Sequence, residues 1–345
     1  MTRLTALMFA LMLGACTPLM TQTAGQPPLG FEGPRLSGDQ FISYDGARLG
    51  LTRWDANDGA PGTVVVAVHG MNDYANAFHL AAPYWAAHGV STYAYDQRGF
   101  GRSPNRGVWP DETVLQEDLR TLVALVRARH PHAEVVVMGE SMGGAVAIRA
   151  FASQRPPDAH RLVLLAPAVW GWSTQPLPYK TALWFAAHVT GPKVYTPPSW
   201  VTDRVRPTDN LAELRAMGAD PLMIWGARSD TLFGLVDLME NAWRDIARLQ
   251  VPVLYLYGQN DEIIPERPAL QAAARLKPSD RTAYYAKGWH LLTRDLQGEV
   301  VMADILAVLT DPQAPLPSGT PPIPTAPGGD EVSPVPAQAT AGLSR

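Results

Sequence analysis

The sequence has little of several residue types that define other classes of protein. It contains one cysteine, Cys16, so an intramolecular disulfide is impossible. No His or Cys pair has the spacing of a metal site, and we expect neither a metal ion nor a cofactor. With a net charge of −4 and no basic cluster, nothing indicates a nucleic-acid partner, and nothing indicates an obligate protein partner. The apolar stretch from Leu4 to Leu13 is too short for a bilayer span, which needs about 20 residues.

That short stretch instead has the pattern of a secretory signal, because Arg3 supplies the positive charge ahead of it. The next residues, Leu-Gly-Ala-Cys over 13–16, resemble a bacterial lipobox, in which cleavage leaves a lipid-modified cysteine. We therefore predict a signal peptide over 1–16 and membrane attachment through a lipidated Cys16 in a bacterial cell envelope. Thr17, rather than Asp, follows the cysteine, which by resemblance to lipoprotein sorting favours the outer membrane. The alternative is an ordinary signal peptide with a chance cysteine.

The chain has 345 residues, of which 46% are hydrophobic, and it is long enough for one large domain with an insertion or for two domains. Pro, Gly, Gln and Thr dominate residues 17–39, which predicts a flexible tether, and the Pro-rich residues 312–345 predict a disordered tail. In the domain between them, over 40–311, apolar runs alternate with helical patterns. The expected strands are 41–44, 49–54, 63–68, 90–95, 135–138, 162–165, 253–257 and 282–285. The expected helices are 77–88, 113–129, 233–247, 266–276 and 296–309. This alternation predicts an α/β fold with a mostly parallel sheet flanked by helices.

The rhythm breaks between about 170 and 231, where prolines are frequent and five of the ten tryptophans lie. We interpret this segment as an insertion that covers the edge of the sheet. At least half of its tryptophans should pack its own small core. The others could line an apolar substrate tunnel.

The central feature of the chain is Gly-Glu-Ser-Met-Gly over 139–143, which follows the apolar run Val135 to Met138. A Gly-x-Ser-x-Gly motif between a strand and a helix places the serine hydroxyl on a sharp turn at the top of a sheet. Ser141 is therefore the candidate nucleophile. A tight turn without chemistry is the alternative that the motif alone leaves open.

A serine nucleophile needs a base and an acid that orients it, in the chain order Ser, Asp or Glu, His. Of the three histidines after Ser141, His160 begins a strand at the wrong edge and His188 lies in the insertion. His290 follows the 282–285 strand directly, so we assign it as the general base. Asp261 follows the 253–257 strand at the same edge and is the favoured acid, with Asp230 as the alternative.

A developing oxyanion requires two backbone N–H donors. The residue after the nucleophile, Met142, supplies one in this type of turn. The other should come from the loop after the 63–68 strand, His-Gly-Met-Asn-Asp over 69–73, where Met71 is the candidate and Gly70 permits close approach. His69 is expected to brace this loop.

Together these stretches resemble the α/β-hydrolase superfamily, and within it the monoacylglycerol lipase and lysophospholipase branch, also described as serine aminopeptidase-like. The resemblance spans about Phe41 to Leu309 and is also carried by Asp-Gln-Arg-Gly-Phe-Gly-Arg-Ser over 96–103, which is expected to be structural, and Asp-Pro-Leu over 220–222. It implies an α/β-hydrolase fold with a cap over about 170–231, the catalytic triad Ser141, Asp261 and His290, and oxyanion donors at Met71 and Met142.

The resemblance implies a serine ester hydrolase that acts on monoacylglycerols or lysophospholipids. Acyl transfer and amide or peptide cleavage use the same triad and remain alternatives. Dehalogenase and epoxide hydrolase chemistry is disfavoured, because those enzymes place a carboxylate where Ser141 stands. A non-catalytic envelope lipoprotein that holds lipid is the alternative from another class of protein.

Overall fold

The computed structural model describes residues 18–57, 59–196 and 205–324. The predicted signal peptide and Cys16 lie outside these residues. Within them, no helix is long and apolar enough to cross a bilayer.

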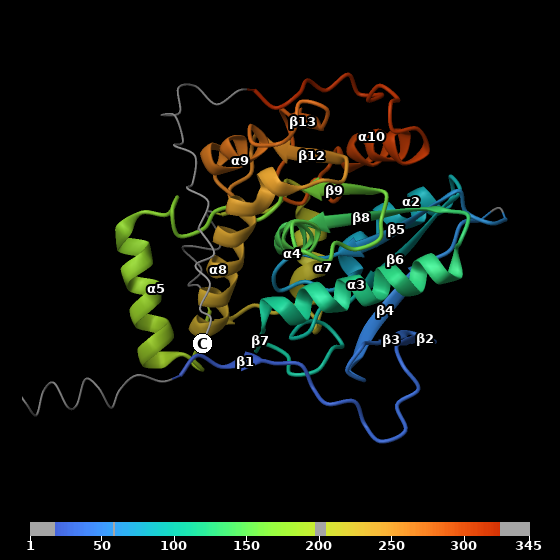
Figure 1. The fold of residues 1–345 in the computed structure, drawn as a ribbon. Coiled ribbons are helices and arrows are strands. Elements are labelled where there is room, and N and C mark those ends of the chain that lie inside the picture. The colour runs from blue at the N-terminus through green and yellow to red at the C-terminus, as the bar shows by residue number, and fades with distance from the viewer. Residues whose placement is uncertain (1–17, 58, 197–204, 325–345) are drawn as a thin grey trace, which may run out of the picture.

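A nine-stranded sheet forms the centre of the domain, with the strand order β13-β12-β9-β8-β5-β6-β4-β3-β2 (Figure 1). The strands from β13 to β6 are parallel, and β4, β3 and β2 continue the sheet antiparallel. The predicted α/β-hydrolase-type sheet is confirmed. The strands are β2 (Arg35–Ser37), β3 (Gln40–Ile42), β4 (Arg48–Trp54), β5 (Thr63–Val68), β6 (Val90–Tyr95), β8 (Glu134–Glu140), β9 (Arg161–Leu165), β12 (Val253–Gly258) and β13 (Arg281–Tyr285).

Helices cover both faces of this sheet, which explains why its central strands are mostly apolar and do not alternate between apolar and polar residues. All six residues of β5 are buried, and Val64 and Val66 face one core cluster while Val65 and Ala67 face the other. The first cluster includes residues of α3 (Glu112–Arg129), α4 (Met142–Phe151), α8 (Ser229–Asp245) and α9 (Glu266–Ala273). The second includes residues of the short helix η1 (Ala75–Phe78), α2 (Ala81–Ala86) and α10 (Gly298–Thr310).

The described residues of the insertion form two further helices and a pair of short antiparallel strands. They are α5 (Leu177–Thr190), α7 (Leu211–Ala219), and β10 (Val194–Tyr195) paired with β11 (Ala227–Arg228), and the short helix η2 (Ile246–Arg248) follows α8. Trp170 and Trp172 pack against the main core, whereas Trp184 and Trp225 are 45% and 50% exposed. The described part of this cap is therefore characterised by exposed tryptophans and not by a closed core of its own. Trp200 lies outside the described residues.

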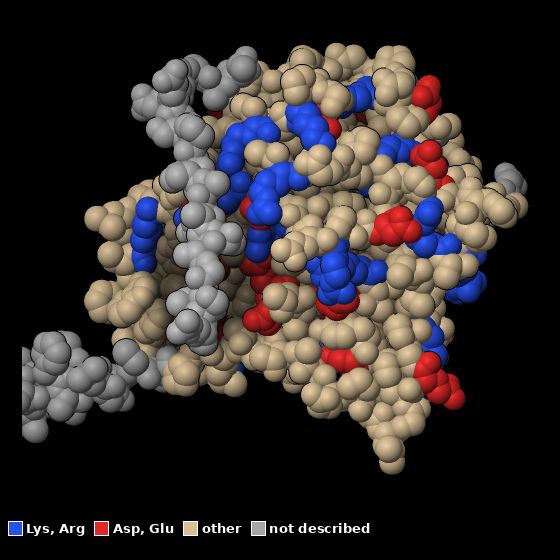
Figure 2. Space-filling model, viewed as in Figure 1, with Lys and Arg blue, Asp and Glu red and all other residues tan. Residues whose placement is uncertain are grey.

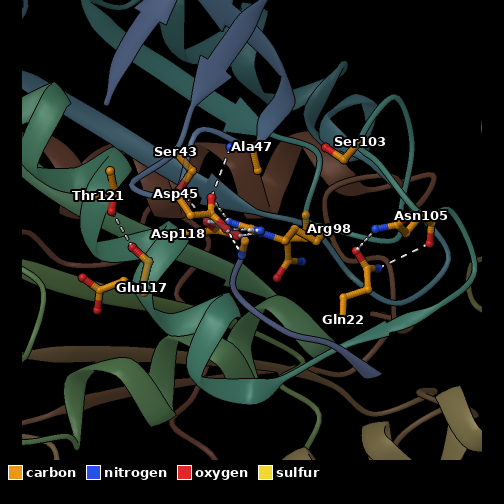
Figure 3. A network of polar contacts seen from close by, with 12 residues as sticks. Gln22, Ser43, Asp45, Ala47, Arg98, Ser103, Asn105, Glu117, Asp118 and Thr121 are labelled. Carbon is orange, nitrogen blue, oxygen red and sulfur yellow. Dashed lines mark hydrogen bonds and ion pairs between the residues drawn. The ribbon is translucent and has the colours of Figure 1, made fainter. Parts of the chain in front are cut away.

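The segment predicted as a flexible tether is attached to the domain at several points. Thr21–Gln22 forms β1, which pairs in parallel with β7 (Trp109–Pro110), and β2 belongs to the sheet. The buried Gln22 side chain donates to the Val108 carbonyl at 2.5 Å and accepts from the Asn105 amide at 3.0 Å (Figure 3). The prediction of a tether over 17–39 is wrong for these residues, because polar side chains satisfy backbone groups that composition alone does not reveal.

The first part of the predicted disordered tail, residues 312–324, also contacts the domain. The Tyr284 amide in edge strand β13 donates to the Pro321 carbonyl at 2.8 Å, and the Ile323 amide donates to the Thr282 hydroxyl at 2.9 Å. The Ser318 amide donates to Asp304 of α10 at 2.9 Å. Prolines accept hydrogen bonds through their carbonyls, so a Pro-rich segment can cover an open sheet edge. The prediction of disorder is wrong for this stretch, and residues 325–345 are not described.

A buried ion-pair network holds the turn before β4 against the loop after β6 and helix α3 (Figure 3). The Arg98 guanidinium donates to Asp45 at 2.8 Å and to Asp118 at 2.7 Å. The Ser43 hydroxyl also donates to Asp118. These contacts give the motif over 96–103 a bracing role, as expected from the sequence.

Candidate active site

Ser141 lies where strand β8 turns sharply into helix α4. Its backbone has φ 52° and ψ −117°, in a region that residues with side chains rarely adopt. A Cβ atom on Gly143 would lie 2.1 Å from the Val68 carbonyl oxygen, so only glycine fits at that position. The strand, strained turn and helix that the motif predicts are therefore present. They place Ser141 at the carboxyl end of a central parallel strand.

Asp261 and His290 meet at the same edge of the sheet, after β12 and β13. The Nδ1 atom of His290 lies 2.8 Å from the Oδ2 atom of Asp261, and both side chains are at most 5% exposed. The other carboxylate oxygen, Oδ1, accepts from the amides of Ile263 and Ile264 at 2.8 and 2.9 Å. A carboxylate only accepts, so Nδ1 carries the proton and Nε2 is the basic nitrogen.

Hydrogen bonds between the two loops keep this pair together. The amide of Gln259 donates to the Tyr285 carbonyl at 3.0 Å, and the amide of Asn260 donates to the Gly288 carbonyl at 2.9 Å. Burial alone would lower the pKa of His290, but the charge and hydrogen bond of Asp261, and the charge of Glu140, raise it above its usual value. The imidazolium form is therefore stabilised, which is the form that a general base passes through.

The alternative residues considered from the sequence lie elsewhere. Asp230 is in the first turn of α8, where it forms an ion pair with Arg228 at 2.6 Å. The Nδ1 atom of His160 accepts from the Val135 amide at 2.9 Å, at the start of β8. His188 stacks on Trp184 in cap helix α5. The structure thus brings His290 and Asp261 together, and the catalytic roles of the triad stay predictions.

The loop after β5 lies directly against the nucleophile. A Cβ atom on Gly70 would lie 3.2 Å from the Cβ atom of Ser141. His69 is fully buried, with Nδ1 2.7 Å from the Gly70 carbonyl and Nε2 accepting from the Gln97 amide at 2.9 Å. Burial lowers the pKa of His69, so it stays neutral and braces the loop. Met71 follows Gly70 in this loop and Met142 follows Ser141, and their roles as oxyanion donors stay predictions.

The cap is fastened to this same loop, a connection that sequence reasoning did not identify. The Ile224 amide donates to the Asn72 carbonyl at 3.0 Å, and the Tyr74 hydroxyl donates to Asp220 at 2.7 Å. Asn72 adopts φ 66°, which asparagine tolerates better than most residues. The stretch over 220–222 carried the family resemblance, and its contact with the loop explains why those residues belong to the site.

An open groove in the cap, about 300 Å³ in volume, has an almost entirely apolar lining. It is lined by Trp172, Lys180, Thr181, Trp184, Phe185 and Phe233. The surface over α5 is mostly uncharged (Figure 2). The groove is formed by cap residues and by Phe233 of α8, and none of the triad residues lines it.

In residues 18–57, 59–196 and 205–324, no group of three or more His, Cys, Asp or Glu side chains has a geometry that could hold a metal ion.

A family model described as serine aminopeptidase, S33, matches residues 59–297. The chain belongs to this α/β-hydrolase family. The matched range begins before β5 and ends just before α10, so it contains Ser141, Asp261 and His290.

Among family relatives, the monoacylglycerol lipase of Mycolicibacterium smegmatis is 28% identical over 268 residues, which cover 77% of this chain and 94% of that protein. The monoglyceride lipase of Homo sapiens is 26% identical over 262 residues, covering 74% and 84%. The monoacylglycerol lipase structure from Paleococcus ferrophilus has a TM-score of 0.62 at 23% identity, covering 76% of this chain and 98% of that one. A soluble variant of the Saccharomyces cerevisiae monoglyceride lipase, in complex with a substrate analog, has a TM-score of 0.67 at 16% identity, covering 84% and 99%.

The solved structures show the fold, at identities where nothing finer is carried over. The sequence relatives identify this chain as a carboxylic-ester hydrolase that is similar to monoacylglycerol lipases.

Proposed function

We propose that this enzyme hydrolyses monoacyl lipid esters, either monoacylglycerols or lysophospholipids, through an acyl-enzyme on Ser141. The observation that carries the proposal is the buried 2.8 Å contact between His290 and Asp261, at the sheet edge where Ser141 occupies a strained turn. A hydrogen-bonded His–Asp pair at the same sheet edge as a serine on a strained strand-to-helix turn is the arrangement that activates a hydroxyl for acyl transfer.

In the first half of the reaction, Ser141 attacks the ester carbonyl while Nε2 of His290 takes its proton. Asp261 holds the imidazole in the correct tautomer and stabilises the imidazolium. The negative charge on the carbonyl oxygen is held by the amides of Met71 and Met142, and the loss of one such donor costs about 10²–10³ in turnover. His290 then gives its proton to the departing alcohol.

In the second half, His290 activates a water molecule that attacks the acyl-enzyme, and the free acid and Ser141 are regenerated. An alcohol in place of water would make the enzyme an acyltransferase, and an amide in place of the ester would make it an amidase. Both use the same residues, so the substrate panel must separate them.

The apolar groove of the cap supports a lipid substrate. Four aromatic side chains, those of Trp172, Trp184, Phe185 and Phe233, line it, and burial of an acyl chain against such a surface is favourable by about 0.8 kcal/mol per CH₂ group. The relatives named as monoacylglycerol lipases agree with this choice.

The test is the release of fatty acid by the chain from Thr17 onward, with Ser141→Ala as the control. Monoacylglycerols, lysophospholipids, aryl esters of graded chain length and an acyl amide make up the panel. Hydrolysis of medium or long monoacyl lipids that is abolished in the control supports the proposal. Activity restricted to short aryl esters, or to the amide, contradicts the substrate assignment. Failure of a fluorophosphonate probe to label Ser141 would favour a non-catalytic lipid-binding protein.

We also propose that the mature enzyme is anchored to the bacterial envelope, on the outer membrane, through a lipidated Cys16. The lipobox-like sequence over 13–16 and the short apolar stretch before it support the proposal. Metabolic labelling with a radioactive fatty acid should mark the wild type and not Cys16→Ala. Equal labelling or equal membrane association of both would contradict the anchor.

A further inference from the structure

One fully buried arginine lies between two carboxylates that belong to other segments of the active site. The Nη2 atom of Arg294 donates to Glu140 Oε1 at 2.7 Å, and its Nη1 atom donates to Asp73 Oδ2 at 2.8 Å. The three side chains are 2%, 1% and 7% exposed. No role follows for Arg294 from the mechanism described above.

The positions of the three residues in the chain are what make the contact notable. Glu140 is the last residue of β8, immediately before Ser141. Asp73 ends the loop that contains Met71, and its Oδ1 atom accepts from the amide of Tyr74. Arg294 follows His290 by four residues. A single guanidinium therefore joins the nucleophile strand, the oxyanion loop and the histidine loop, and its planar fork fixes their spacing.

This network is costly as a source of stability alone. Two buried carboxylates share one cation, and within the described residues Glu140 Oε2 and Arg294 Nε have no hydrogen-bond partner. Apolar residues of similar volume often replace a buried ion pair without loss of stability. The retained charges therefore indicate a task other than stability.

We propose that Arg294 is a positioning residue that holds the oxyanion loop at the correct distance from Ser141. Without it, the carboxylates of Glu140 and Asp73 repel each other, and the loop that carries the Met71 amide moves away from the nucleophile. An error of about 1 Å in such a position costs on the order of 10²-fold in rate. The inference rests on the proposed acyl-enzyme mechanism.

Arg161 offers a matched control at the opposite end of β8. It is the first residue of β9, it is also buried, and it forms an ion pair with Glu134, the first residue of β8, as Arg294 does with Glu140, the last. The two carboxylates are about 20 Å apart along the strand. Arg161→Met therefore removes a buried guanidinium that pairs with β8, without touching the site.

The experiment compares Arg294→Met, Arg294→Lys and Arg161→Met in the full chain, with a soluble aryl ester as substrate. Three quantities are measured per active site titrated with a fluorophosphonate: kcat, KM and the inhibition constant of a trifluoromethyl ketone, which forms an oxyanion adduct. We expect Arg294→Met to lower kcat 10- to 100-fold and to weaken the ketone by a similar factor, with KM within about threefold. Arg294→Lys should recover part of both losses, and Arg161→Met should change neither.

The inference is overturned if Arg294→Met retains kcat and ketone affinity within twofold, or if Arg161→Met reduces them equally. If Arg294→Met does not fold, the variant Asp73→Asn tests the inference instead. Its single amide oxygen can accept from Arg294 or from the Tyr74 amide but not from both, so kcat and ketone affinity should fall 3- to 10-fold, and unchanged values refute the inference. Failure of the proposed function is distinct, because the wild type would then not be titrated by the fluorophosphonate.

Discussion

The substitution Asp261→Asn tests the core of the proposed mechanism, because the structure determines how the new amide must lie. The Oδ1 position accepts from two backbone amides, those of Ile263 and Ile264. The asparagine oxygen takes that position, since the opposite orientation would leave two buried N–H groups unpaired at about 1–3 kcal/mol each. The NH₂ group therefore faces Nδ1 of His290.

Two N–H donors cannot hydrogen-bond to each other, so Nδ1 of His290 must accept from the asparagine NH₂ group. The imidazole proton therefore moves from Nδ1 to Nε2. The nitrogen that should accept the proton of Ser141 is then already protonated. A wrong tautomer of this kind lowers kcat by about 10⁴-fold in a serine protease triad, which corresponds to about 5 kcal/mol of transition-state stabilisation. We expect a loss of 10³- to 10⁴-fold here, with the fold intact.

The assay is ester hydrolysis at pH 8 by purified protein, with circular dichroism and thermal melting to verify folding. Asp230→Asn is the matched control, because Asp230 is also a buried carboxylate and was the alternative acid, but it pairs with Arg228. It should retain kcat within about threefold. Activity of Asp261→Asn within tenfold of the wild type would refute the reasoning, and a loss confined to Asp230→Asn would transfer the role to that residue.

Three further outcomes are expected. Gly143→Ala should yield no stable protein, because its Cβ would lie 2.1 Å from a carbonyl oxygen. Gly218→Ala, in open space on α7, should instead raise the free energy of unfolding by about 0.5–1 kcal/mol. Urea denaturation compares the two variants, and equal stability would contradict the steric argument. The pKa of His290 is raised above its usual value of 6.5, so kcat/KM should fall as the pH drops and the imidazole becomes protonated. A pH profile of kcat/KM whose acid midpoint lies at or below 6.5 would contradict this expectation. A chain ending at residue 311 should melt a few degrees below one ending at 324, because the hydrogen bonds to β13 and α10 are lost; identical Tm values would show that the segment adds no stability.

Local patterns in the sequence were sufficient for much of the fold. The run over 63–68 is apolar at every position after Thr63, because both faces of a central parallel strand are covered, and the structure has β5 at those residues. The strand, Gly-x-Ser-x-Gly and helix around Ser141 are equally local, since the glycines make the sharp turn possible. The helix expected over 77–88 is instead a short η1 followed by α2, a difference of local geometry that periodicity does not resolve.

Amino-acid composition predicted the wrong structure at both described ends of the domain. Residues rich in Pro, Gly and Gln predict disorder because they bury little apolar surface. Gln22 and the segment 312–324 are held by hydrogen bonds to loops and strands far away in the chain. Such contacts depend on where those partners lie after folding, and composition contains no information about that.

The sequence by itself determined the strand–helix alternation and the nucleophile turn at Ser141, because each follows from residues close together in the chain. It also determined the order of the candidate triad, because each candidate directly follows a predicted strand. Only the tertiary structure decided that Asp261, rather than Asp230, contacts His290, and that Arg294 joins Glu140 to Asp73. The physical reason is that these side chains are separated by 29 to 221 positions along the chain. They meet only because parallel strands bring their carboxyl ends to one edge of the sheet.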